Sequence, residues 1–241
     1  MGDVLSLNRL SKAFGGLMAL NDVSFSVAEG EIVGLIGPNG AGKTTLFNAV
    51  NGYFPPTSGS VTYLGRVVTG FPPDRMARLG MGRTFQIVRP FPHLSVLENV
   101  MVGAFLRYPS RPAAERRAWE VLEFIGLQDA AHRPAGQLTL AGRKRVEVGR
   151  ALALEPRLLL LDEVSAGLNP AEADRLVELI RQIRERGVTI LIVEHVMRVI
   201  MRISDRIVVL NYGRKIAEGT PAEVARNPEV IQAYLGEAAD A

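Results

Sequence analysis

One short glycine-rich segment has the composition and spacing of a phosphate-binding loop. Residues 37–44 read Gly-Pro-Asn-Gly-Ala-Gly-Lys-Thr and match the pattern G-x-x-x-x-G-K-[ST]. The glycines allow backbone amides to turn toward an anion, and a following helix adds the positive end of its dipole. Lys43 would reach the β- and γ-phosphates of a nucleotide, and the Thr44 hydroxyl would hold Mg²⁺. The alternative is a glycine-rich turn with a solvated lysine.

A pair of carboxylates follows an apolar run later in the chain. Residues 158–161 are four leucines, and Asp162 and Glu163 come directly after them. A buried strand that ends in this way could place Asp162 at a Mg²⁺ ion bound to a triphosphate. Glu163 could then accept a proton from the attacking water, which is worth about 10²–10⁴ in rate. Without the phosphate loop, a core strand that meets a solvated loop would be the simpler interpretation.

The segments around these residues predict how they are positioned. Short alternating runs predict strands at 5–7, 23–27 and 31–36, and a hairpin at 60–68. The alternation is lost after Gly42, and a helix is expected over 43–50. In the last third, strands at 158–161, 189–193 and 207–210 alternate with helices at 170–186 and 196–202. This alternation is typical of a mostly parallel α/β sheet.

The middle of the chain is expected to be helical. Ser95 and Glu98 have the spacing of a capping box, and a helix over 113–125 would be closed by Gly126. The same capping pattern, with a proline in the first turn, opens two later helices at 169–172 and 220–223.

Composition excludes several classes of protein. The chain has 241 residues, 47% of them apolar, and 28 basic against 25 acidic residues give a net charge of +3. It has no cysteine, which excludes disulfide frameworks, thiolate zinc sites and thiol catalysis. Its apolar runs are far shorter than the roughly 20 residues of a membrane span, and we expect no secretory signal. The basic residues form no long tract, so nucleic-acid binding is not implied.

The order of these motifs resembles the ATP-binding subunits of ABC transporters, over nearly the whole chain. Residues 83–86, Arg-Thr-Phe-Gln, are similar to the family's Q-loop, 165–170 to its D-loop, and His195 to the histidine of its H-switch. The resemblance implies ATP and Mg²⁺ as ligands. It assigns catalytic roles to Glu163, His195 and Gln86, metal contacts to Thr44, Gln86 and Asp162, and adenine stacking to Phe14. Taken singly, such a Gln, His or Phe is more often structural.

The nucleotide contacts implied by the resemblance come from two segments. In the phosphate loop they are Gly37, Pro38, Asn39, Gly40, Ala41, Gly42, Lys43, Thr44 and the adjacent Thr45. The family signature, commonly L-S-G-G-Q, would contribute Leu140, Ala141 and Gly142 to the nucleotide of a partner subunit. Leu140 is placed at the serine position and Arg143 at the glutamine position. A lost serine hydroxyl would remove a hydrogen bond worth about 1.5–3 kcal/mol from the nucleotide bound by the partner subunit. Because Glu163 serves this chain's own nucleotide, hydrolysis in a heterodimer is expected to depend more on Glu163 than on the equivalent glutamate of the partner.

The resemblance also implies a fold. It is the α/β P-loop NTPase fold of ABC ATPases, with a mixed, mostly parallel sheet core, an antiparallel β subdomain and a helical lobe. We expect one domain over 1–241, in which 1–74 and 156–241 form the RecA-like core with the β subdomain and 75–155 form the lobe. Residues 90–92, Pro-Phe-Pro, with Ile87 and Leu94, would form a docking patch for a membrane subunit, rimmed by Arg83 and Arg89. An ordinary proline-rich turn is the alternative.

Several segments, among them 14–17 and 83–100, are most similar to ATPases of bacterial branched-chain amino-acid importers. This resemblance implies membrane permease subunits and a second ATPase subunit as partners, in a heterodimer or a homodimer, and indirectly a substrate-binding protein. The expected location is peripheral, at the cytoplasmic face of the inner membrane. Alternatives are an ATPase for urea, an amide or another substrate, a lipid exporter ATPase, and a soluble ABC ATPase acting on nucleic acid.

Overall fold

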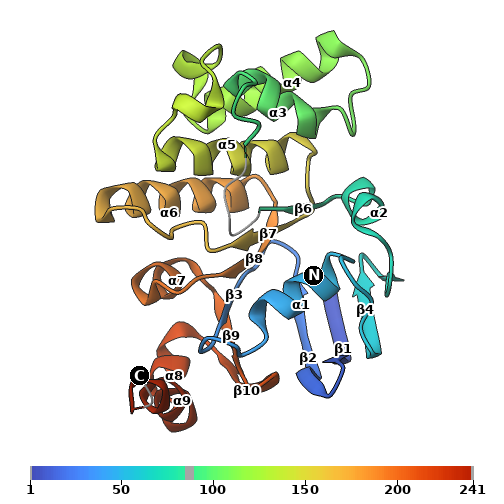
Figure 1. Cartoon of the computed structure of the whole chain (residues 1–241), viewed down its shortest axis with the longest axis vertical. Coiled ribbons are helices and arrows are strands. Elements are labelled where there is room, and N and C mark those ends of the chain that lie inside the picture. Colours follow the sequence, from blue (N-terminus) through green and yellow to red (C-terminus); the bar gives the residue numbers. More distant parts are fainter. Residues whose placement is uncertain (1, 85–89, 240–241) are drawn as a thin grey trace.

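The protein is built from two β-sheets with a group of helices at one end (Figure 1). The computed structural model describes residues 2–84 and 90–239, with side chains described as far as Tyr234. The antiparallel sheet has the order β2-β1-β4-β5, from β1 (Asp3–Phe14), β2 (Leu17–Ala28), β4 (Ser58–Tyr63) and β5 (Arg66–Val67). The larger sheet has the order β10-β9-β3-β8-β7-β6, from β3 (Ile32–Ile36), β6 (Met81–Arg83), β7 (Leu158–Asp162), β8 (Thr189–Val193), β9 (Arg206–Asn211) and β10 (Arg214–Gly219). All of its pairings are parallel except that of β9 with β10.

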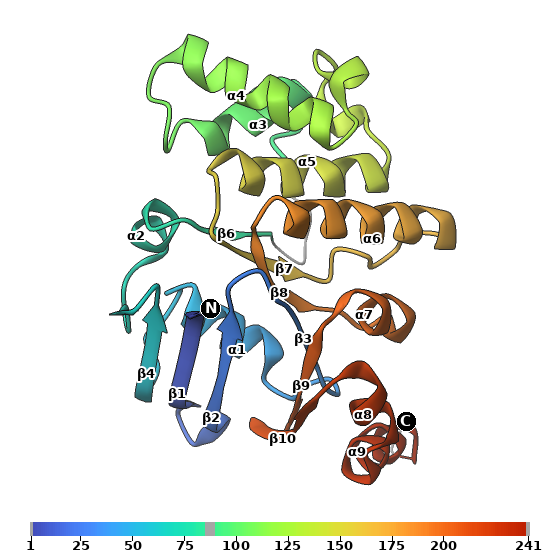
Figure 2. The same ribbon diagram turned by 180° about the vertical axis from the view of Figure 1, so that it is seen from behind.

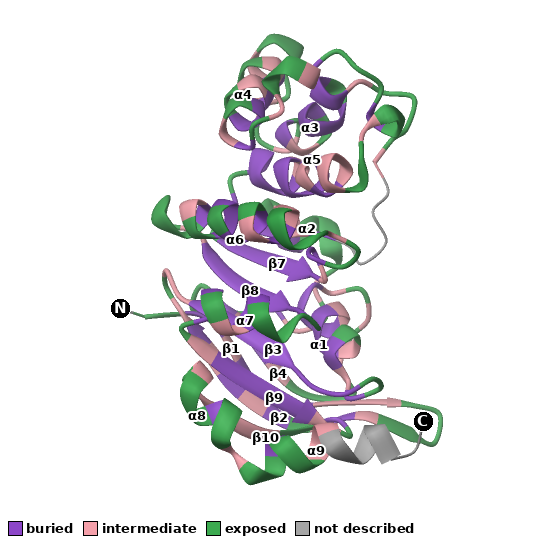
Figure 3. Ribbon diagram, turned by 90° about the vertical axis from the view of Figure 1, so that its left-hand side faces the viewer, coloured by how far each residue is buried: buried purple, intermediate pink, exposed green. Residues whose placement is uncertain are grey.

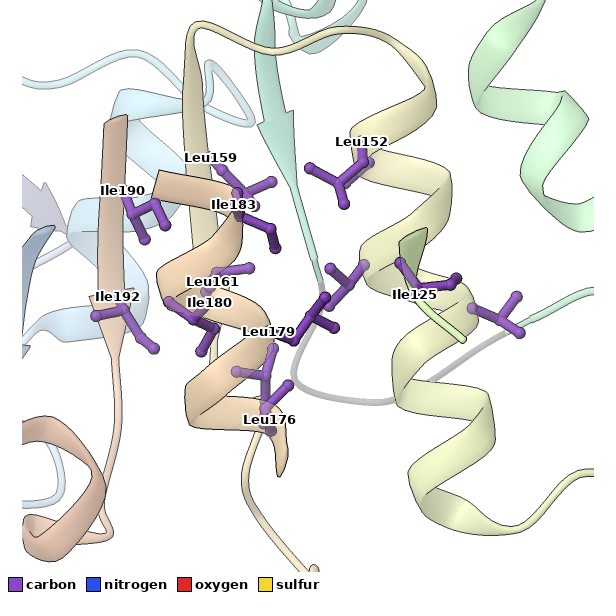
Figure 4. Packing of buried hydrophobic residues seen from close by; sticks show 14 of the residues in the cluster. Ile125, Leu152, Leu159, Leu161, Leu176, Leu179, Ile180, Ile183, Ile190 and Ile192 are labelled. Atoms are coloured by element: carbon purple, nitrogen blue, oxygen red, sulfur yellow. The ribbon is translucent and has the colours of Figure 1, made fainter. Parts of the chain in front are cut away.

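The central strands of the larger sheet are buried on both faces (Figure 3). Every residue of β3, β7 and β8 is buried, which explains why these strands are continuous apolar runs. Successive side chains of a strand point to opposite faces, so each strand contributes to two cores. Leu159, Leu161, Ile190 and Ile192 pack against α6 (Pro170–Glu185), as Figure 4 shows, while Leu158, Leu160 and Leu191 pack toward the antiparallel sheet and α1 (Lys43–Val50).

The helices divide between the sheet and the end of the molecule. Helices α3 (Val96–Ala104), α4 (Arg111–Phe124) and α5 (Leu140–Ala153) lie together, with α6 between them and the sheet (Figures 1 and 2). The other helices are α2 (Pro73–Arg78), α7 (Met197–Ile203), α8 (Pro221–Arg226) and α9 (Pro228–Ala239). Short 3₁₀ turns at Gln128–Ala130 and Ala135–Gln137 precede α5. In the described parts of the chain, we find no helix with the length and apolar character of a membrane span.

The start and stop signals in the sequence predicted several of these elements. The helix at 43–50 and the strand at 189–193 have the expected bounds, and the three capping boxes are present, including that of Ser95 with Glu98. The α/β fold with a mixed sheet, an antiparallel sheet and a helical group is confirmed.

Other expectations need correction. Residues 75–155 were expected to be helical, but Met81–Arg83 forms β6, which pairs with β7 in the larger sheet. A three-residue strand carries too little alternation to be detected from its sequence. The first two strands are each 12 residues long, because pairing with each other extends them well beyond their apolar positions.

The capping box of α3 gives a first test. Ser95 Oγ accepts a hydrogen bond from the Glu98 amide, and the Glu98 carboxylate accepts one from the Ser95 amide. For Ser95→Ala we expect the free energy of unfolding to fall by about 1 kcal/mol, which lowers Tm by about 2–4 °C. The control is Ser110→Ala, because Ser110 is the N-cap of α4 but makes no side-chain cap bond within the described residues. Equal Tm values for the two variants in thermal unfolding would contradict the assignment.

Candidate nucleotide-binding site

The phosphate loop lies between β3 and α1. Two of its glycines are required by close backbone neighbours. A Cβ atom on Gly37 would lie 2.1 Å from the Leu210 carbonyl oxygen, and one on Gly42 would lie 2.6 Å from the Ala19 carbonyl oxygen. The loop therefore packs closely on β9 and β2, and Gly42 is the N-cap of α1, whose first turn holds Lys43 and Thr44.

The lysine of the loop is held by the loop itself. Lys43 is buried, and its ammonium donates hydrogen bonds to the carbonyl oxygens of Gly37 and Pro38 at 2.6 and 2.8 Å. A nucleotide phosphate would offer stronger, charged acceptors in place of these carbonyls. The lysine ammonium is thus held inside the loop.

Asp162 is a buried carboxylate at the end of β7. Its Oδ2 atom lies 3.3 Å from the Arg83 guanidinium, and its amide donates to Thr84 Oγ1. Burial raises the pKa of Asp162 above its ordinary value, and the Arg83 charge opposes that shift. Its Oδ1 atom is buried and has no hydrogen-bond partner among the described residues.

This unsatisfied oxygen fits a metal ligand. Mg²⁺ prefers oxygen donors and is commonly held by one or two protein groups together with phosphates. Asp162 Oδ1 and the exposed Thr44 hydroxyl are the described groups that would hold it. When bound, Mg²⁺ would neutralise charge on the phosphates.

Glu163 and His195 lie in the loops after β7 and β8, and their side chains are in contact. His195 Nε2 lies 2.6 Å from Glu163 Oε1. Glu163 has a positive φ of 50°, which is unusual for a residue with a side chain, and its amide donates to the Val193 carbonyl. A carboxylate next to an imidazole, beside a phosphate loop, can accept a proton from a water molecule.

A cavity of about 490 Å³ is lined by residues 39–45 together with Glu163 and His195, whereas Gly37, Pro38 and Asp162 are not among its lining residues. Its lining includes the expected residues Phe14, Asn39, Gly40, Ala41, Gly42, Lys43, Thr44, Thr45, Glu163 and His195. Phe14 is half exposed at the rim, and its ring meets that of Phe54 edge-on at 5.2 Å. Leu17, Met18, Ala19 and Tyr212, which the motifs did not indicate, also line the cavity. The first three open β2 and Tyr212 lies in the turn after β9, and because side chains in such places carry no sequence signal of binding, only the fold brings them here.

The signature segment, residues 140–142, does not line the nucleotide cavity. Ala141 and Gly142 line a separate cavity of about 360 Å³ between α5 and α6, and Leu140 is partly exposed. Thr139, which directly precedes Leu140, is the N-cap of α5, and its Oγ1 accepts from the Gly142 amide at 3.2 Å. The assignment of Leu140 to the serine position, and the impaired partner site expected from it, remain predictions. Gln86, with Ile87 and Arg89, lies outside the described residues.

A phosphate loop, a buried aspartate at a strand end and a Glu–His pair define a P-loop nucleotide hydrolase. A family model described as "ABC transporter" matches residues 20–166, and one described as "Branched-chain amino acid ATP-binding cassette transporter" matches residues 214–240. The chain is 46% identical to the high-affinity branched-chain amino acid transport ATP-binding protein LivG of Salmonella typhimurium, over 98% of each chain.

Solved structures agree with these matches. The ADP conformation of MJ1267, an ATP-binding cassette of an ABC transporter, has a TM-score of 0.90 and 31% identity, covering 98% of this chain and 100% of that one. The dimeric post-hydrolysis state of the cassette MJ0796, bound to ADP and Pi, has a TM-score of 0.81 and 28% identity, covering 90% and 98%. The chain belongs to the ATP-binding proteins of ABC transporters, and it is an ATPase.

The variant Glu163→Gln tests whether Glu163 is the general base of ATP hydrolysis. The amide keeps the size of the side chain but cannot accept the proton, so we expect kcat for MgATP hydrolysis to fall by about 10²–10⁴. Phosphate release measures kcat, and titration with MgATP is expected to show unchanged binding. The control is Glu178→Gln, because Glu178 is an exposed glutamate on α6. This variant is expected to leave kcat and MgATP binding unchanged. Wild-type turnover by Glu163→Gln would refute this role.

Proposed function

We propose that this chain is the ATP-hydrolysing subunit of a bacterial importer for branched-chain amino acids, bound at the cytoplasmic face of the inner membrane. The observation that carries the substrate assignment is the match of residues 214–240, outside the ATPase motifs, to the branched-chain amino-acid group. LivG, the relative described above, is itself named for this transport. The substrate would reach the importer through a substrate-binding protein that never contacts this chain.

The geometry supports a simple sequence of events for ATP. Phe14 stacks on the adenine, which is worth roughly 1–3 kcal/mol. Lys43 exchanges the carbonyls of its own loop for the β- and γ-phosphates. Glu163 accepts a proton from the attacking water, and His195, which lies 2.6 Å from that carboxylate, holds the water and the γ-phosphate. Gln86 would link this site to the membrane subunits.

A second ATPase subunit would complete the site. The turn of Leu140, Ala141 and Gly142 opens α5, and a helix N-terminus of this kind attracts phosphate. In a head-to-tail pair, each such turn would contact the nucleotide bound by the other subunit, with the Thr139 hydroxyl beside it. We propose a heterodimer with a different ATPase. ATP binds the closed pair more tightly, and this difference in affinity drives the attached permeases between conformations.

The permease is proposed to dock on the helical group near Phe91. Phe91 is 47% exposed and Leu94 is 37% exposed. The turn that carries them is fixed by Asn99, a fully buried side chain that accepts from the Phe91 amide and donates to the carbonyls of Phe91 and Leu94. Fixed, exposed apolar groups on a turn suit the apolar face of a cytoplasmic helix from the permease.

Uptake by the reconstituted importer tests the function. The chain would be co-expressed with the candidate permeases and second ATPase, and placed in proteoliposomes with the substrate-binding protein. We expect ATP-dependent uptake of labelled leucine, isoleucine and valine and no uptake of urea or amides. Uptake of urea or an amide alone would overturn the substrate assignment. Copurification with nucleic acid and no permease would overturn the transporter assignment.

Phe91→Asp provides the matched variant for this assay. A charge in an apolar contact is costly to desolvate, so we expect loss of both assembly and uptake, with unchanged MgATP binding by the isolated chain. Val67→Asp is the control, because Val67 is exposed on β5, far along the chain from this turn. Assembly of the Phe91→Asp chain with the permease would place the docking surface elsewhere.

A further inference from the structure

A group of buried charged side chains lies behind the nucleotide cavity, between α5 and the loops after β7 and β8. Lys144, Glu147 and Glu194 are each less than 5% exposed, and so is Ser165. None of these residues lines the nucleotide cavity. Burying charge without a partner is costly, so their contacts need an explanation.

The contacts converge on one short turn, residues 163–165. Lys144 Nζ donates a hydrogen bond to the Glu163 carbonyl oxygen at 2.9 Å. The Glu194 carboxylate accepts from the Ser165 amide at 2.7 Å and from the Ser165 hydroxyl at 2.5 Å. Two buried side chains, one on α5 and one directly after β8, therefore fix the backbone of this turn.

The turn needs this support because of its conformation. Glu163 has a φ of 50°, and a residue other than glycine keeps such a conformation only where its surroundings impose it. The amide of Glu163 is held by the Val193 carbonyl at 2.9 Å and its carbonyl by Lys144. If the hydrogen bond from Lys144 is lost, the peptide group after Glu163 can rotate, and φ of Glu163 can return to the negative values usual for a residue with a side chain. The carboxylate would then move relative to His195.

We propose that Lys144 is a positioning residue for hydrolysis, whose ammonium fixes the backbone of Glu163 and thereby aims the Glu163 carboxylate at the water. Lys144 lies two residues after Gly142, on the first turns of α5. The position of the base thus depends on the helix that begins at the signature turn. This inference rests on the ATPase role of Glu163 in the proposed function.

Three variants of the full chain test the proposal. Lys144→Met keeps much of the side-chain length but has no donor, Lys144→Arg keeps a charged donor, and Arg145→Met changes the neighbouring cation, which has no described contact with Glu163. The measurements are kcat and KM for MgATP, the affinity for MgATP, and Tm. A misplacement of a reacting group by about 1 Å can reduce the rate about 100-fold.

We expect Lys144→Met to lower kcat at least about 10-fold, while KM and nucleotide affinity stay near wild type. Lys144→Arg is expected to recover most of kcat, and Arg145→Met to behave as wild type. Unchanged kcat in Lys144→Met would overturn the proposal, as would a parallel loss of kcat and nucleotide affinity, or no recovery in Lys144→Arg.

If Lys144→Met does not fold, Lys144→Leu, which also lacks a donor, is judged by the same criteria. Failure of both to fold would overturn the proposal, because the role of Lys144 would then be structural. The wild-type chain and Glu163→Gln are measured in parallel. Equal hydrolysis by those two would refute the role of Glu163 itself, whereas normal hydrolysis by Lys144→Met alone would refute only the positioning role.

Discussion

Strands β3, β8 and β7 lie next to one another and run in the same direction. Their carboxyl ends therefore meet at one edge of the sheet, and each end leads into a functional segment. The phosphate loop follows β3, Asp162 ends β7 with Glu163 directly after it, and His195 follows β8. Because every residue of these strands is buried, their register cannot shift without exposing the core. The geometry of the site is thus a consequence of how the core is packed.

The buried charges of the molecule gather at this same edge. Asp162 pairs with Arg83, and Lys144 with the Glu163 carbonyl beside Glu194. Buried ionic groups contribute little to stability, so their concentration here indicates a role in the site. They hold backbone and carboxylates in fixed positions. Such preorganisation is what stabilisation of a transition state requires.

The residues expected at a nucleotide were easier to predict from the sequence than the residues that support them. Lys43, Asp162 and Glu163 stand in local patterns whose spacing carries their chemistry, and the cavity brings Phe14, Glu163 and His195 together. Lys144 contacts Glu163, which lies 19 residues further along the chain, and Asn99 contacts Phe91, which lies 8 residues before it. No local sequence pattern reveals such contacts.

The central claim is that the ends of β3 and β7 together form one MgATP site. It is tested most directly by titrating ATP into the wild-type chain, Thr44→Val, Asp162→Asn and the double variant, each with and without Mg²⁺. The account predicts that Mg²⁺ strengthens ATP binding to the wild type, and that each single variant loses about 10-fold or more of this gain. The double variant should lose little beyond the larger single loss, because both groups serve one ion. A full Mg²⁺ effect in Asp162→Asn would contradict the account.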